Sequence, residues 1–202
     1  MEKAKSIVFI GDSITDCGRT KPTVSEFGFG YAAKCIARIR EMNPDVPLYN
    51  RGIIGECIGQ VHARFQRDCL DLNPGLVSIL IGINDVDYSY RHAGHVFDEA
   101  LLARQLEEMY SSVKLAGSKL IVMETFAFHG ELYHDEYYPR LKWLRETQKA
   151  LADQYADVYY KTCMKPELTL EGLHPTSEGH HALYVQWMQV AMENGLLNFI
   201  MH

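Results

Sequence analysis

A serine near the start of the chain and a histidine near its end have the setting that nucleophilic chemistry needs. Residues 7–16 read IVFIGDSITD, so a short apolar run leads directly into Ser13. Residues 171–175 read EGLHP, with Glu171 three positions before His174. A serine hydroxyl reacts when a neighbouring base takes its proton, and a carboxylate can orient that base. The three side chains therefore predict acyl transfer, with Ser13 as the nucleophile, His174 as the base and Glu171 as the partner of the histidine.

Each of these residues also has a simpler interpretation. The Gly-Asp-Ser segment could be a turn whose side chains satisfy local backbone donors, and a lone histidine is often an ordinary hydrogen-bonded or exposed side chain. Glu171 could point away from His174, which would leave a Ser–His dyad helped by a backbone carbonyl. Glu167 and Glu178 are the other nearby acidic residues, but their spacing from the histidine fits the role less well. The pattern favours the triad over the dyad.

Four short blocks occur in order along most of the chain: GDSITD (11–16), YNRGIIG (49–55), GIND (82–85) and EGLHPT (171–176). Together they resemble the blocks of the GDSL hydrolases, also called the SGNH family. The resemblance implies that Gly55 and Asn84 donate hydrogen bonds to the oxyanion, together with the Ser13 amide. Glycine lets a backbone amide approach closely, and an asparagine amide donates without charge. The simpler interpretations are a helix-entry turn for Gly55 and a cap for Asn84.

Glu171 departs from the family pattern, because the family usually carries aspartate three residues before the histidine.

Further segments at 16–19, 49–52 and 80–86 resemble the intracellular carbohydrate-esterase branch, which removes acetyl groups from xylose-based sugars. The resemblance implies a small acylated substrate such as an acetylated sugar, and no cofactor or metal. The alternatives are a lysophospholipase or acyl thioesterase, which would need an apolar groove for a longer acyl chain, and a non-catalytic binding module on the same fold.

The elements that must position these residues alternate along the chain. Continuous apolar runs predict buried strands at 6–10, 76–81 and 119–123, with weaker candidates at 47–50 and 157–160. Strands that alternate with helices indicate an α/β fold with a mostly parallel sheet. The family resemblance implies a flavodoxin-like three-layer α/β/α sandwich. We expect one domain over residues 1–202.

Apolar residues recur at helical spacing in four stretches, at 58–72, 102–113, 141–155 and 183–190. Gly117 and Gly195 fit as helix stops, and Thr176 or Ser177 fits as the cap of the last helix. The carboxyl ends of parallel strands share one edge of a sheet. The Ser13, Gly55 and Asn84 segments all follow predicted strands, so we expect them to converge at that edge.

Composition excludes several classes of function. The chain has 202 residues and a net charge of −6, without a basic stripe, which disfavours a nucleic-acid partner. It lacks the roughly 18 consecutive apolar residues of a membrane span, so no membrane partner is expected. The charged start, residues 1–5, precedes a short apolar run without a cleavage site, unlike a signal peptide. Five cysteines without metal spacing favour a reducing cytoplasm.

The cysteines and the C-terminal tail leave alternatives open. Cys35 and Cys69 fall on apolar helix faces, which favours buried thiols, whereas Cys17 and Cys57 lie near the predicted site and could be open to modification. The tail at 196–201 reads LLNFIM, so it either packs on its own domain or covers a neighbouring subunit. We favour a homo-oligomer, as the resemblance to the esterase branch also implies.

The loop after residue 123 is rich in aromatic and histidine side chains, among them Phe126, Phe128, His129, His134 and Tyr138. Such a cluster could form a platform for a sugar ring, or it could simply pack the loop. The spacing of the two histidines is poor for a metal pair.

Overall fold

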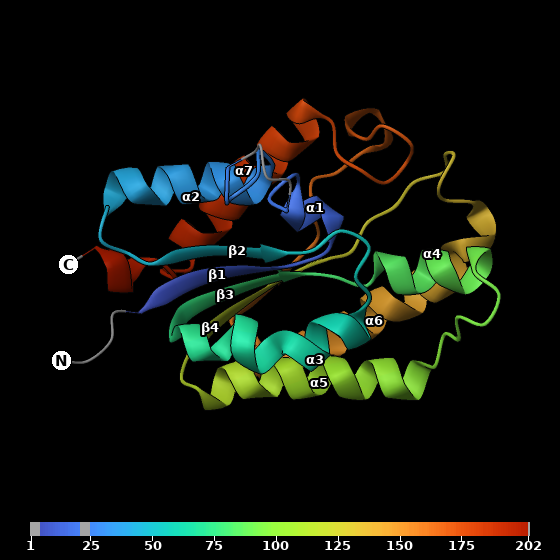
Figure 1. Ribbon diagram of the computed structural model, residues 1–202, viewed down its shortest axis with the longest axis horizontal. Coiled ribbons are helices and arrows are strands. Elements are labelled where there is room, and N and C mark those ends of the chain that lie inside the picture. Colours follow the sequence, from blue (N-terminus) through green and yellow to red (C-terminus); the bar gives the residue numbers. More distant parts are fainter. Residues whose placement is uncertain (1–4, 21–24, 202) are drawn as a thin grey trace.

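The computed structural model describes residues 5–20 and 25–201, so most of the charged start at 1–5 lies outside the described residues. Five parallel strands form one sheet in the order β2-β1-β3-β4-β5 (Figure 1). In chain order they are β1 (Ser6–Gly11), β2 (Leu48–Gly52), β3 (Pro74–Leu80), β4 (Lys119–Met123) and β5 (Val158–Tyr160). This order is the flavodoxin-like one, with β1 and β3 side by side where the winding reverses. The expected parallel sheet is confirmed.

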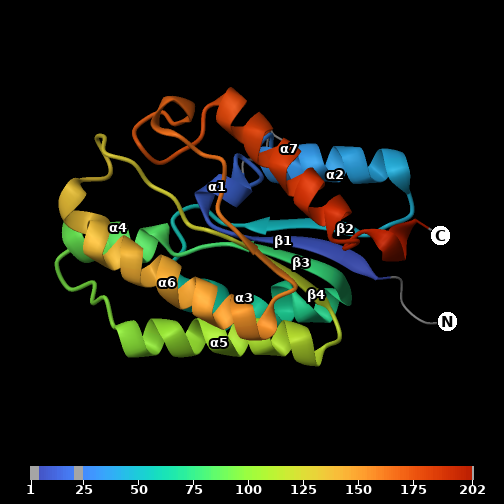
Figure 2. The ribbon, with the colours of Figure 1, turned by 180° about the vertical axis from the view of Figure 1, so that it is seen from behind.

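Helices cover both faces of the sheet. They are α1 (Ser13–Asp16), α2 (Tyr31–Met42), α3 (Ile58–Asp68), α4 (Ile83–Arg91), α5 (Glu99–Leu115), α6 (Tyr138–Tyr155) and α7 (Ser177–Glu193). Short 3₁₀ turns occupy Leu70–Leu72, Asp135–Tyr137, Pro166–Leu168 and Asn198–Ile200. Helices α2 and α7 pack together on one face, and α3, α5 and α6 cover the other (Figures 1 and 2). The three-layer sandwich is therefore confirmed. None of the described helices is both long and apolar enough to cross a membrane.

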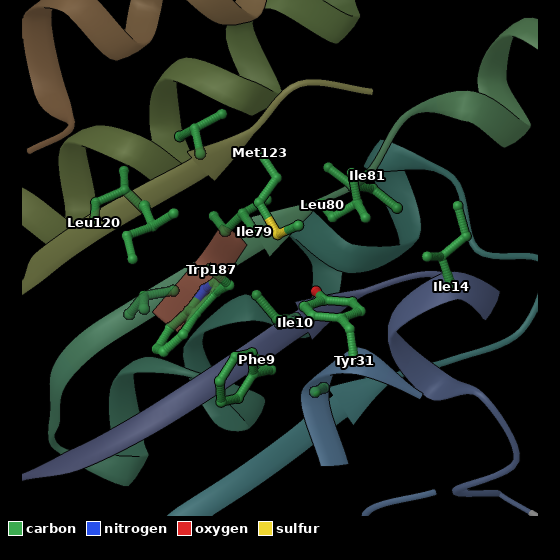
Figure 3. Close-up of a cluster of buried hydrophobic side chains, with 14 of the residues drawn as sticks. Phe9, Ile10, Ile14, Tyr31, Ile79, Leu80, Ile81, Leu120, Met123 and Trp187 are labelled. Atoms are coloured by element: carbon green, nitrogen blue, oxygen red, sulfur yellow. The ribbon is translucent and has the colours of Figure 1, made fainter. Parts of the chain in front are cut away.

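Strand β1 is buried from end to end, and β3 is buried at every residue except Gly75, because both faces of the sheet are covered. Trp187 of α7 is fully buried, and its ring lies 4.9 Å from that of Phe9 on β1 (Figure 3). The Trp187 Nε1–H donates to Ser78 Oγ on β3 at 2.9 Å, so the one polar atom of the indole is satisfied in the core. This contact fixes α7, and with it the preceding loop that carries His174, against the sheet.

Some elements differ from the sequence expectations. Helix α4 was not predicted, because it is short and only two of its buried residues, Ile83 and Val86, are apolar. Cys69 does not lie within a helix: it ends α3, and the chain continues through a 3₁₀ turn to Asn73 in the left-handed region. Thr176 is the cap of α7, where its side chain accepts the Gly179 N–H at 3.0 Å.

The apolar tail packs back on its own chain. Leu196, Leu197 and Ile200 are each less than 5% exposed, and the Ile200 carbonyl accepts from Asn43 Nδ2 at 2.8 Å. The Phe199 ring covers Gly75 at the start of β3. The tail thus takes the first of the two alternatives, so its apolar sequence gives no argument for a second subunit.

Candidate active site

Ser13 follows directly from the carboxyl end of β1. Asp12 caps α1 by accepting the Ile14 N–H on Oδ1 at 3.0 Å, which turns the chain sharply out of the sheet. Ser13 is then the first residue of α1, where helix geometry leaves its own N–H without an intrahelical partner. The Ser13 Oγ lies 3.0 Å from His174 Nε2, a hydrogen bond between residues 161 positions apart.

His174 and Glu171 lie on the loop before α7 and contact each other. The Glu171 carboxylate hydrogen-bonds His174 Nδ1, and it also accepts the His174 backbone N–H at 3.3 Å. With the proton on Nδ1, the Nε2 lone pair faces the Ser13 hydroxyl. Glu167, on an exposed 3₁₀ turn, and Glu178, exposed on α7, lie outside this hydrogen-bonded chain. The structure therefore brings Ser13, His174 and Glu171 together.

Gly55 lies on the loop after β2, and Asn84 lies at the start of α4, which follows β3. Asn84 is buried in the first turn of α4, and its Nδ2 donates to the carbonyl of Glu56, next to Gly55, at 2.8 Å. Gly55 has φ +78°, and a Cβ there would come within 2.9 Å of the Tyr88 hydroxyl, so the position requires glycine. Among the described residues, no hydrogen bond joins Gly55 or Asn84 directly to Ser13.

Buried acids lie beneath this edge of the sheet. Asp12 is 1% exposed, and burial raises its pKa to about 7, although the Ile14 N–H and His174 act in the opposite direction. Its Oδ2 is buried without a hydrogen-bond partner among the described residues. Asp85 accepts the Ile58 N–H at 3.0 Å and thereby fixes the start of α3. Burial raises its pKa to about 7 as well.

A cavity of about 570 Å³ opens at Ser13 and His174. Its walls are mainly apolar, and three large side chains on its lining, Phe29, Ile54 and Leu170, are more than half exposed. Exposed apolar side chains grouped around a reactive serine indicate a binding surface rather than packing.

Sequence reasoning missed a pair beside this cavity. His180 belongs to α7, and its Nδ1 accepts the Tyr31 N–H at 3.2 Å. The proton must then be on Nε2, which lies 3.3 Å from Cys17 Sγ. Burial lowers the pKa of His180 to about 4, so the ring is neutral at pH 7. Cys17 also lies close to Ser13, as its position in the sequence predicts.

The aromatic loop after β4 divides into packed and exposed side chains. Phe126, Tyr133 and Tyr137 are buried, whereas His129 and Tyr138 are exposed on the lining of a separate cavity of about 490 Å³. The loop meets the His174 loop where the Phe128 N–H donates to the Gly172 carbonyl at 2.7 Å. The packing interpretation thus holds for the buried members, and a sugar platform stays a prediction for the exposed ones.

Comparisons with known proteins agree with this geometry. Residues 9–182 match the model of the GDSL-like lipase/acylhydrolase family. An acetylxylan esterase of Geobacillus stearothermophilus is 30% identical over 198 residues, covering 89% of this chain and 90% of that protein.

Solved structures extend the comparison. Axe2, an acetylxylan esterase from the same organism, superposes with a TM-score of 0.78 at 25% identity, covering 94% of this chain and 95% of that one. A protein of Parabacteroides merdae described as a GDSL-like lipase gives a TM-score of 0.83 at 26% identity, covering 97% and 98%. The chain belongs to the GDSL-like lipase/acylhydrolase family and is a carboxylic ester hydrolase.

Proposed function

We propose that this protein hydrolyses short-chain esters, acetyl esters of xylose-based or related sugars in particular, through Ser13, His174 and Glu171. The observation that carries the proposal is the continuous hydrogen-bonded chain from the Ser13 hydroxyl through the His174 ring to the Glu171 carboxylate. It links three groups in the order that proton transfer requires.

In the proposed reaction Ser13 Oγ attacks the ester carbonyl while its proton passes to His174 Nε2. The His174 ring becomes a cation, which the adjacent Glu171 carboxylate stabilises. The protonated ring then gives its proton to the departing sugar hydroxyl, which leaves an acetylated serine. Water, deprotonated in turn by His174, releases acetate and restores the Ser13 hydroxyl.

The oxyanion is assigned to the Ser13 N–H, the Gly55 N–H and Asn84 Nδ2. The Ser13 N–H has no helix partner, and the left-handed backbone at Gly55 supports a turn that presents its amide. Asn84 Nδ2 carries two hydrogens and donates one to Glu56, so the second is available for the substrate.

The sugar substrate rests on the relatives. Three solved variants of Axe2 are described as catalytic mutants, in which a serine, an aspartate or a histidine is replaced by alanine. The aspartate and the histidine of Axe2 are three positions apart, as Glu171 and His174 are here. We assign the same roles to Ser13, Glu171 and His174. Separately, we expect a cytoplasmic enzyme, because Cys35, Cys57, Cys69 and Cys163 are not in disulfides.

One observation favours a second candidate, an esterase or thioesterase for longer acyl chains. The cavity at Ser13 is lined mainly by apolar side chains, and Phe29, Ile54 and Leu170 leave much of their surface exposed to a ligand. An acetyl group buries too little surface to use such a wall, whereas each added methylene would gain about 0.8 kcal/mol.

The two candidates separate in one experiment. The specificity constant kcat/KM is measured on p-nitrophenyl esters from acetate to octanoate, and on acetylated xylo-oligosaccharides. The sugar-ester proposal predicts the highest value for acetyl groups, with rates falling as the chain lengthens. A rise through hexanoate and octanoate, with no release of acetate from the oligosaccharides, would replace it by the second candidate. Ser13→Ala is the control for both, because it should abolish turnover on every substrate.

A further inference from the structure

Three side chains of the kinds that bind transition metals meet beside Gly55, on a cavity that Ser13 does not line. They are Cys57, Asp85 and His95, and their Sγ, carboxylate oxygen and ring nitrogen all lie within 4.8 Å of one another. They come from three different segments: the cap of α3, the first turn of α4 and the loop between α4 and α5. No short sequence motif joins them, which is why the spacing of the cysteines gave no metal signal.

Two of the three donors are held rigidly by helix starts. The Cys57 sulfur accepts the backbone N–H of Gln60, whose side chain in turn accepts the Cys57 N–H at 2.8 Å. Asp85 is fixed by the Ile58 N–H on one carboxylate oxygen. The Cys57 sulfur therefore already accepts a hydrogen bond, and the Asp85 carboxylate is already held in one orientation.

His95 supplies the adjustable ligand. It is half-buried on a loop, and its ring lies edge-on to Tyr88 with the centroids 5.9 Å apart. Tetrahedral zinc with bonds of about 2.0–2.3 Å places its ligand atoms roughly 3.5 Å apart. The three ligand atoms lie within 4.8 Å of one another, so a small closure of the cluster, of roughly 1 Å, would reach that spacing.

The surroundings suit a cation. The cluster lines a cavity of about 400 Å³ that has no lysine or arginine among its described lining residues. Burial raises the pKa of the Cys57 thiol, and the neighbouring carboxyl groups of Asp85, Asp12, Glu56 and Asp87 raise it further, as negative charge does. A positive ion would therefore be attracted to the cluster, and the cavity leaves room for a water molecule as the fourth ligand.

We propose that Cys57, Asp85 and His95 form a binding site for a transition-metal dication of the zinc class. The mixture of thiolate, imidazole and carboxylate suits Zn²⁺ or Co²⁺ and is unsuited to Mg²⁺ or Ca²⁺, which prefer oxygen ligands alone. On binding, Cys57 loses its thiol proton to solvent and forms the metal–sulfur bond. The site is separate from Ser13 and His174, so the proposal does not depend on the proposed function.

The test uses Co²⁺ as the probe, because a cobalt–thiolate bond gives an absorption band in the near ultraviolet. The full-length protein is stripped with a chelator and titrated with Co²⁺, and Zn²⁺ is then added as competitor. We expect one Co²⁺ per chain, a thiolate band, and loss of that band as Zn²⁺ displaces cobalt. Wild-type protein without a thiolate band would overturn the proposal.

Matched variants locate the site. Cys57→Ser should remove the band. His95→Ala removes one of three ligands and should weaken Co²⁺ binding by at least about tenfold, which corresponds to roughly 1.4 kcal/mol. Two control variants should bind Co²⁺ as the wild type does. Cys69→Ser removes a buried thiol at the other end of α3, and His92→Ala removes a second histidine next to Tyr88. A band that survives in Cys57→Ser, or equal weakening by His92→Ala and His95→Ala, would contradict the assignment. His95→Ala decides the question if Cys57→Ser does not fold, because His95 lies on a half-exposed loop.

Discussion

The carboxylate of Glu171 gives the sharpest test of how His174 is activated. Glu171→Gln keeps the size of the side chain and removes its charge. An amide NH₂ can donate to Nδ1, which would force the His174 proton onto Nε2, the atom that must accept the proton of Ser13. The variant therefore loses both the partner of the imidazolium and the correct tautomer.

The magnitude follows from the geometry. A hydrogen bond to a charged group contributes about 1.5–3 kcal/mol, which corresponds to roughly 10–10²-fold in rate. In a serine protease triad the wrong tautomer raises the loss to about 10⁴-fold. The side chains of Glu171 and His174 are 18% and 38% exposed, so water can partly replace the lost partner. We expect kcat to fall by about 10²–10³-fold, with little change in KM.

The assay is steady-state hydrolysis of p-nitrophenyl acetate at pH 8, with two comparison variants. Glu167→Gln removes an exposed carboxylate from the same loop and should leave kcat within about twofold. Glu171→Asp keeps the charge on a shorter side chain and should be more active than Glu171→Gln. If Glu171→Gln and Glu167→Gln have equally small effects, Glu171 is not part of the machinery and a Ser–His dyad must be assigned instead.

Three further predictions follow from other parts of the structure. Asn84→Ala should lower kcat by roughly 10²–10³-fold with a smaller change in KM, because the amide acts when charge develops on the substrate oxygen; an effect on KM alone would place Asn84 in substrate binding. Leu197→Ala should lower the free energy of unfolding in urea by about 2–5 kcal/mol, whereas Met201→Ala, at a 60% exposed position, should change it by less than about 0.5 kcal/mol; equal effects would mean that the tail does not pack as described. Asp12 has its pKa raised from 3.8 in the unfolded chain to about 7 in the folded protein, so the folded state keeps a proton that the unfolded state loses, and stability falls as pH rises from about 4 to about 7. Asp12→Asn should remove up to about 4 kcal/mol of that loss, measured by urea unfolding at pH 4.5 and 7.5, and an unchanged slope would show that Asp12 ionises normally.

Much of the fold could be predicted because the sheet is buried on both faces. Continuous apolar runs such as residues 76–81 are typical of strands that helices cover on both sides. Helices α5, α6 and α7 carry apolar residues at helical spacing. Helix α4 escaped prediction because it is short and three of its buried side chains, Asn84, Asp85 and Asp87, are polar, which weakens the apolar pattern.

The candidate site could be predicted only in part. Ser13, Glu171 and His174 are recognisable because their local sequence resembles a family pattern, and the hydrogen bonds among them follow. Contacts between distant segments, such as Cys17 with His180 or Cys57 with Asp85 and His95, leave no pattern in the sequence. These contacts arise from loop conformations, such as the left-handed backbone at Cys17, which leave no periodic pattern in the sequence.

The most direct test of the central claim is covalent labelling of Ser13. A p-nitrophenyl alkylphosphonate reacts only with a serine whose proton is taken by a base, and it leaves a stable adduct that mass spectrometry can locate. We predict one adduct per chain on the peptide that contains Ser13, no adduct in Ser13→Ala, and labelling slowed by at least about 10³-fold in His174→Ala. Labelling at another residue, or an undiminished rate without His174, would contradict the account.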